Sequence, residues 1–98
     1  MIVVREVFYA KPGQAGKLAR LMREVMSEAY PNGNIRIMTD YISEFNKVVM
    51  ETELADLAAF ENRMAEYRVN TNEELKAKMA GYMDMYSEGR REIYQVVE

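Results

Sequence analysis

The sequence predicts a single α+β domain over residues 1–98, with an antiparallel four-stranded sheet covered on one face by helices. Runs rich in β-branched and aromatic residues predict the strands, and stretches with apolar residues at helical spacing lie between them. The resulting order is strand, helix, strand, strand, helix, extra helix, strand, which is the split βαβ arrangement. Such a short chain buries only about 60–65% of its unfolded surface, so its own core is thin.

The first strand is predicted over residues 2–10, and the first helix from about Gln14 to Ala29. Lys11-Pro12-Gly13 ends the strand, and proline suits a helix start because its missing N–H would be unpaired there. The turn residues of segment 30–34 end the helix. The apolar stripe of this helix comprises Leu18, Leu21, Met22, Val25, Met26 and Ala29.

Residues 35–42 and 47–53 are predicted to form a hairpin around the turn Ser43-Glu44-Phe45-Asn46. We expect Ile42 to lie opposite Lys47, because this register separates the side chains cleanly into two faces. One face carries Ile35, Ile37, Thr39, Tyr41, Val48, Met50 and Thr52. The other face carries Arg36, Met38, Asp40, Val49, Glu51 and Glu53.

A second amphipathic helix is predicted from Ala55 to about Arg68, and a third from Thr71, which forms a capping box with Glu74. The apolar stripe of the second helix is Leu57, Phe60, Met64 and Tyr67. That of the third is Leu75, Met79, Tyr82, Met83 and Tyr86. Gly89 is expected to cap the third helix at its C-terminus, before a last strand over residues 90–97.

Helices can cover only one face of such a sheet, which leaves the other face open in a monomer. The first strand is rich in apolar residues on both sides (Val3, Val7 and Tyr9 against Val4 and Phe8) and is expected to be buried on both. A second copy of the chain packed on the open face would supply the cover, which predicts a homodimer. The alternative is a monomer with a half-polar sheet face.

The composition excludes several kinds of chemistry. The chain contains no cysteine and no histidine, which rules out disulfides, thiolate nucleophiles, cysteine–zinc sites, Ser-His-Asp triads and histidine-ligated haem. No spacing of carboxylates calls for a metal ion, and no cofactor is expected. Any general acid or base would have to be a carboxylate or a tyrosine.

Charge and hydropathy set the expected surroundings and partners. The net charge of −3 comes with scattered Lys and Arg, so nucleic-acid binding is not expected. No apolar stretch approaches the roughly 20 residues of a membrane span, and the N-terminus lacks the layout of a signal peptide. A soluble cytoplasmic protein is expected.

Two stretches resemble the dimeric α/β-barrel superfamily of ferredoxin-like proteins. The first is the turn and helix start Lys11-Pro12-Gly13-Gln14-Ala15-Gly16-Lys17, which follows a strand ending in aromatic residues. The second is a hairpin strand that carries Glu51 and runs into the alanine-rich segment 53–60. The resemblance is nearest to NIPSNAP-like proteins, and next to antibiotic-biosynthesis monooxygenase-like and EthD-like proteins.

The resemblance implies two ferredoxin-like units whose sheets pack face to face into a barrel. It also implies a ligand pocket, either between each sheet and its helices or within the barrel. Members of the superfamily include cofactor-independent monooxygenases, haem-degrading enzymes and isomerases. The haem-degrading members use a histidine ligand and the monooxygenase-like members often place a histidine in the second helix, but the segment Phe60 to Tyr67 has none. Catalytic residues therefore do not transfer to this chain.

We expect Glu6, Asp40, Glu51 and Glu53 to converge on the concave face of one sheet, with Arg36 beside them. Carboxylates gathered in a partly dry cavity would have raised pKa values and could act as acids or bases. The alternative is that Arg36 and Glu53 form a cross-strand ion pair and the other carboxylates are solvated. The candidate pocket residues are Glu6, Phe8, Arg36, Met38, Asp40, Glu51 and Tyr94.

Three functions remain open at this point. The first is the binding of a small apolar or aromatic molecule, with monooxygenase- or isomerase-like chemistry, in a cavity of roughly 300 Å³ or more. The abundance of tyrosine and methionine suits such a ligand. The second is a non-catalytic dimeric interaction or regulatory module, and the third is an accessory protein with no ligand.

Overall fold

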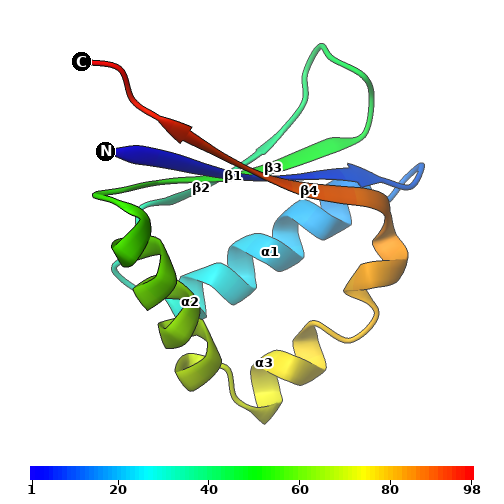
Figure 1. Ribbon diagram of the computed structural model, residues 1–98. Coiled ribbons are helices and arrows are strands. Elements are labelled where there is room, and N and C mark those ends of the chain that lie inside the picture. Colours follow the sequence, from blue (N-terminus) through cyan, green and yellow to red (C-terminus); the bar gives the residue numbers. More distant parts are fainter.

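The computed structural model describes residues 1–98 and has the predicted ferredoxin-like α+β fold (Figure 1). Four antiparallel strands form one sheet in the order β2-β3-β1-β4, and all helices lie on one side of it. The strands are β1 (Ile2–Ala10), β2 (Ile35–Thr39), β3 (Lys47–Leu54) and β4 (Tyr86–Gln95). The helices are α1 (Ala15–Ala29), α2 (Leu57–Asn70), α3 (Glu73–Lys78) and the short 3₁₀ helix η1 (Tyr82–Met85). None of these helices has the length and apolar character needed to cross a bilayer.

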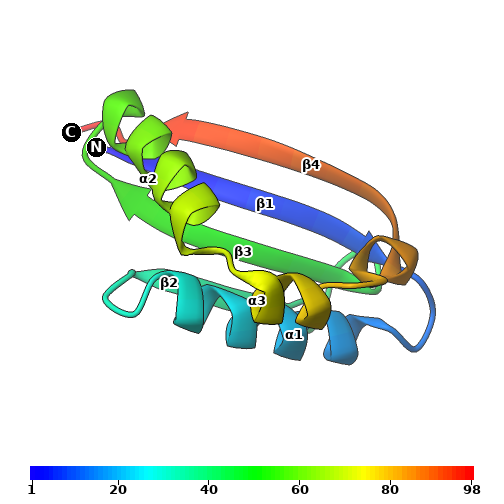
Figure 2. The same cartoon turned by 90° about the horizontal axis from the view of Figure 1, so that it is seen from below.

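Helix α1 packs along β2 and β3 and supplies the centre of the core. Its predicted apolar stripe faces the sheet, and Leu18 and Val25 are fully buried. Leu18 packs with Met22, Ala10 and Val48 in one buried cluster. Figure 2 shows the other helices from below: α2 crosses the end of the sheet where the N-terminus lies, and α3 lies beneath α1. The helical layer therefore closes around the lower face of the sheet.

The register of β1 decides which of its side chains face the helices. Val4 lies opposite Thr52, and Glu6 lies opposite Met50 on β3 and Arg91 on β4. Because side chains alternate along a strand, Val4, Glu6 and Phe8 point to the helical layer, and Arg5 and Val7 point to the open face. Val7 is nonetheless buried, whereas Val3, Arg5 and Tyr9 on the same face are half-buried, so the predicted burial of β1 on both sides holds only in part.

The hairpin has the predicted division into two faces but a different register. Val48 lies opposite Thr39, where the predicted register places Tyr41, so the pairing is shifted by two residues and both faces are preserved. Strand β2 ends at Thr39, and Asp40 closes the loop by accepting a hydrogen bond from the Lys47 N–H and donating its own N–H to the Lys47 carbonyl. The loop 40–46 is longer than the predicted four-residue turn, and its last two residues, Phe45 and Asn46, have positive φ.

The start of α3 differs from the predicted capping box. Asn72, not Thr71, is the N-cap, and its side chain accepts a hydrogen bond from the Leu75 N–H. The Thr71 hydroxyl instead donates to the carbonyl of Tyr67 at the end of α2. Asn and Thr are both favourable N-cap residues, so their intrinsic preferences do not decide which of the two caps α3. The geometry of the α2–α3 connection decides it.

The predicted third helix is also shorter than expected, because α3 ends at Lys78. Gly81 adopts φ 82°, a left-handed conformation that breaks the helix and leads into η1. Strand β4 then begins at Tyr86 rather than at residue 90. Gly89 is therefore a strand residue opposite Phe8, and a Cβ atom there would lie 3.1 Å from the Phe8 ring.

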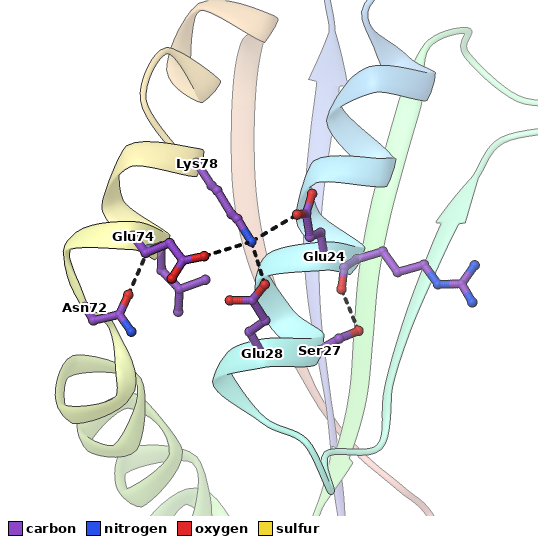
Figure 3. Close-up of polar contacts among 8 residues, drawn as sticks. Glu24, Ser27, Glu28, Asn72, Glu74 and Lys78 are labelled. Atoms are coloured by element: carbon purple, nitrogen blue, oxygen red, sulfur yellow. Dashed lines mark hydrogen bonds and ion pairs between the residues drawn. The ribbon is translucent and has the colours of Figure 1, made fainter.

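Helix α3 is held against α1 by Lys78, which pairs with two carboxylates of α1 and with Glu74 on its own helix (Figure 3). The Lys78 ammonium lies 2.6 Å from Glu28, 3.1 Å from Glu24 and 3.8 Å from Glu74. Hydrogen bonds to Glu28 and Glu24 raise the pKa of Lys78 above its usual value. Together with buried Leu75, these contacts hold α3 against α1 and so position the segment after α3, which lines the site described next.

Candidate functional site

A cavity of about 220 Å³ lies between the sheet and the helical layer. It is smaller than the roughly 300 Å³ expected from the sequence. Of its 19 lining residues, 15 are hydrophobic. In Figure 2, α2 runs obliquely across the strands, whereas α3 lies over α1. The cavity is the candidate functional site of the protein.

Alternate residues of two central strands form the floor of the cavity. On β1 these are Val4, Glu6 and Phe8, and on β3 they are Met50, Thr52 and Leu54. The walls come from the apolar stripe of α1, from α2, and from the segment that follows α3. The wall residues that recur in the predicted stripes are Leu21, Met22, Val25, Met26, Phe60, Met64, Tyr67, Met79 and Tyr82.

Methionine is the commonest residue type in the lining. Met22, Met26, Met50, Met64 and Met79 line the cavity, out of nine methionines in the chain. Their side chains are unbranched and flexible, so the walls can adapt to ligands of different shape. The Tyr67 hydroxyl lies 2.9 Å from the Met79 sulfur and donates a weak hydrogen bond to it.

One ion pair crosses the floor of the cavity. The Arg91 Nε donates a hydrogen bond to the Glu6 carboxylate at 2.5 Å, across the pairing of β4 with β1. The guanidinium of Arg91 also lies over the Phe60 ring, 5.2 Å from its centroid. The Glu6 side chain is 17% exposed and the Arg91 side chain 44%, so the pair compensates the charge of Glu6 at a partly open edge of the cavity. Glu6 is the one carboxylate of the lining and is the group that could accept a proton from a bound molecule.

A second polar group gathers around Arg63 on α2. Its guanidinium donates to the Thr52 hydroxyl at 3.1 Å and lies 5.0 Å from the centroid of the Tyr30 ring. The Tyr30 hydroxyl in turn donates to the backbone carbonyl of Arg63 at 2.9 Å. Burial raises the pKa of Tyr30 to about 12, and the neighbouring Arg63 charge offsets only part of this effect. Tyr30 is therefore a neutral donor at physiological pH.

Aromatic rings close the cavity at the end formed by η1. Tyr82 lies 6.0 Å from Tyr86, and Tyr86 meets Phe8 edge to face with ring centroids 4.9 Å apart. Burial raises the pKa of the Tyr82 phenol above its usual value. These rings give the site an aromatic end opposite the polar groups of α2.

The predicted site residues divide between two faces of the sheet. Glu6 and Phe8 line the cavity. The predicted convergence of Glu6 with Glu51 is wrong, because their strand positions point to opposite faces. The open face carries Arg36, Met38 and Glu51, with Tyr94 on β4 half-exposed.

The remaining carboxylates have other roles. Asp40 lies in the hairpin loop, where it bonds the Lys47 N–H. The alternative pair of Arg36 with Glu53 is also wrong. Glu51 binds Arg36, and its other oxygen lies 3.3 Å from the Arg5 Nε. No group of three or more Asp and Glu side chains is placed so that it could hold a metal ion.

Sequence reasoning missed the two arginines of the cavity. Arg91 is found only from the register of β4, which places it beside Glu6. Arg63 follows Phe60 by one helical turn, so its position on the apolar stripe of α2 was a usable signal. Thr52 was placed on the correct face, but its contact with α2 depends on the crossing of helix and sheet.

Comparison with solved structures finds the same architecture in other proteins. An uncharacterised NIPSNAP domain protein from Burkholderia xenovorans superposes with a TM-score of 0.80 at 10% identity, covering 99% of this chain and 95% of that one. A NIPSNAP family protein from Agrobacterium tumefaciens gives 0.78 at 16% identity, over 99% of this chain and 86% of that one. This chain has the NIPSNAP-like fold.

An antibiotic biosynthesis monooxygenase is also similar, with a TM-score of 0.69 at 17% identity and all of both chains covered. The fold of this chain is thus shared by uncharacterised NIPSNAP proteins and by a monooxygenase. At these identities the likeness concerns the fold alone. No protein-family model and no curated protein sequence matches the chain.

Proposed function

We propose that the protein binds a small apolar or aromatic molecule in the cavity between its sheet and its helices. The observation that carries this proposal is a cavity of about 220 Å³ whose lining is mostly apolar but contains the Glu6–Arg91 ion pair. An apolar protein cavity of about 150 Å³ is known to take up benzene, so this one has room for a substituted ring. Convergent polar groups in an apolar pocket are typical of ligand sites.

The chemistry of a bound molecule would depend on few groups. With no histidine or cysteine in the chain, proton transfer in the cavity falls to Glu6 or to a tyrosine. The likeness to an antibiotic biosynthesis monooxygenase supports monooxygenation of the bound molecule as the reaction to assay first. Binding itself does not need this reaction.

The methionines provide a direct test of binding. Protein labelled with ¹³C at the methionine methyl groups is titrated with small aromatic compounds and followed by NMR. We expect shifts at the five methionines that line the cavity, and unchanged signals for Met1, Met38, Met83 and Met85. Shifts spread equally over all nine methyl groups, or no shifts with any compound, would contradict the proposal.

A matched pair of variants makes this test sharper. Met79→Trp fills part of the cavity and should weaken binding at least about tenfold, since the indole ring occupies volume that the ligand needs. Met83→Trp introduces the same side chain at an exposed position of η1 and should leave binding unchanged. Equal effects of the two substitutions would mean that the ligand binds elsewhere.

We also propose that two copies of the chain associate through their open sheet faces. Tyr94 on this face is 50% exposed, beside Val7 and Val49, which are already buried within the single chain. In Figure 1 the hairpin loop rises above the same face. The loop residues Tyr41, Ile42 and Phe45 are 100%, 91% and 81% exposed, which is unusual for large apolar side chains. A second copy would cover both features.

The alternative function, a dimeric interaction module without a ligand, would use this face alone.

A further inference from the structure

Arg63 is the one cation of the cavity that has no anionic partner. The lining contains two guanidinium groups and one carboxylate, and the carboxylate of Glu6 is already paired with Arg91. Arg63 takes part in none of the ion pairs of the structure. The lining as a whole therefore carries one uncompensated positive charge.

No neighbour of Arg63 forms an ion pair with it, and this includes Glu66, the carboxylate of α2 near Tyr30. Its guanidinium uses one of its five N–H donors on the Thr52 hydroxyl, and it lies against the Tyr30 ring. The Tyr30 phenol stays protonated, because burial raises its pKa to about 12. Stacking on the ring and the bond to Thr52 hold the guanidinium in place while most of its donors stay free. A fixed planar fork of this kind suits a carboxylate, which it can bind through two parallel hydrogen bonds.

We propose that the ligand of the cavity is a small aromatic or alkyl monocarboxylate, with its carboxylate on Arg63 and its apolar part among the methionines. This inference rests on the proposed binding function. A single negative charge matches the single uncompensated cation, whereas a phosphate monoester would bring excess negative charge toward Glu6. The whole chain has a net charge of −3, so its overall field does not favour anions, and a preference for an acid would have to arise locally.

The test compares an acid with its neutral counterpart of the same shape. Binding of 3-phenylpropanoate and of 3-phenylpropanamide is measured at pH 7 by the methionine methyl shifts. The acid should bind at least about tenfold more tightly than the amide, because a charge-assisted bidentate pair is stronger than a neutral hydrogen bond.

Three variants assign this preference to Arg63. In Arg63→Gln the acid should lose its advantage while the amide binds as before. Arg63→Lys, which keeps the charge, should restore a part of the preference. Arg68→Gln removes an exposed arginine from the last turn of the same helix and should leave the preference unchanged.

The outcomes separate this inference from the function on which it rests. Equal binding of acid and amide to the unaltered protein would overturn the carboxylate ligand and leave the apolar site standing. A preference that persists in Arg63→Gln, or an equal loss of both ligands in that variant, would also overturn it. Absence of binding for both compounds, and for the wider aromatic panel, would overturn the binding function itself.

Discussion

Individual polar side chains give the cavity its electrostatic character. Glu6 and Arg91 compensate each other on the sheet, whereas Arg63 is held by a hydroxyl and an aromatic ring. Tyr30 joins these contacts to α1, since its hydroxyl donates to the Arg63 carbonyl while its ring stacks on Tyr67 with centroids 6.2 Å apart. Burial favours the neutral phenol, and this makes the stability of the protein depend on pH.

The free energy of unfolding should fall as the pH rises from about 10 to about 12. The Tyr30 phenol has the ordinary tyrosine pKa of 10.0 in the unfolded chain, whereas burial raises its pKa to about 12 in the folded protein. Between these values the unfolded state binds fewer protons than the folded state, so raising the pH favours unfolding. Urea unfolding at pH 9, 10, 11 and 12 measures the slope.

Tyr30→Phe removes this contribution and should make the decline less steep. Part of the decline should remain, because the raised pKa of Lys78 stabilises the folded state below pH 10.5 and this contribution is lost as the pH rises further. A decline of the same steepness in Tyr30→Phe and in the unaltered chain would show that the phenol does not contribute.

The strands and helices were predictable from periodicity to a large extent, and their ends were not. The alternation of apolar residues assigned each side chain of the hairpin to one of two faces. Sliding one strand along the other by two residues leaves every side chain on the same face, so the pattern could not distinguish the two registers. The Asp40–Lys47 contacts make the choice between them. The sequence predicted one helix whose apolar stripe continued past Gly81 to Tyr86. In the structure this stretch is divided between α3, η1 and the start of β4, and the 3₁₀ helix and the strand also place apolar residues toward the interior. Periodicity does not detect a break that depends on a left-handed glycine.

That break can be tested with two glycine substitutions. Gly81→Ala should reduce the free energy of unfolding by about 1–2 kcal/mol, since alanine at φ 82° is strained although its Cβ would meet no atom within 4 Å. Gly16→Ala is the matched control in α1, where alanine favours the helix and should stabilise by up to about 1 kcal/mol. Urea unfolding measures both changes. An unaltered midpoint in Gly81→Ala would show that this turn is not constrained.

At the scale of the whole molecule, the helical layer covers one face of the sheet and leaves the other open (Figure 1). The sequence predicted this asymmetry from the split βαβ order of its elements, because helices in that order cover only one face of the sheet. It did not predict that the cavity would lie wholly on the helical side, because the face of Glu6 follows from its pairing with Arg91 and Met50. The candidate residues on the open face, among them Arg36, Met38 and Glu51, then fit a surface between two copies better than a pocket.

Light scattering coupled to size-exclusion chromatography measures this association. At micromolar concentration the chain should elute with twice the mass of one copy. Met38→Glu adds a charge to the half-buried part of the open face and should weaken the dimer at least about tenfold, whereas Met83→Glu on η1 should not. A monomeric unaltered chain, or a Met38→Glu dimer of full strength, would contradict association through this face.

The central claim, that the cavity beneath the sheet is a ligand site, is tested most directly by a crystal structure of the protein grown with 3-phenylpropanoate. The account predicts electron density for the ligand between β1, β3 and α2, with the ring among Met50, Met64 and Met79 and the carboxylate on Arg63. A cavity closed by repacked side chains, or ligand density found only outside it, would contradict the account.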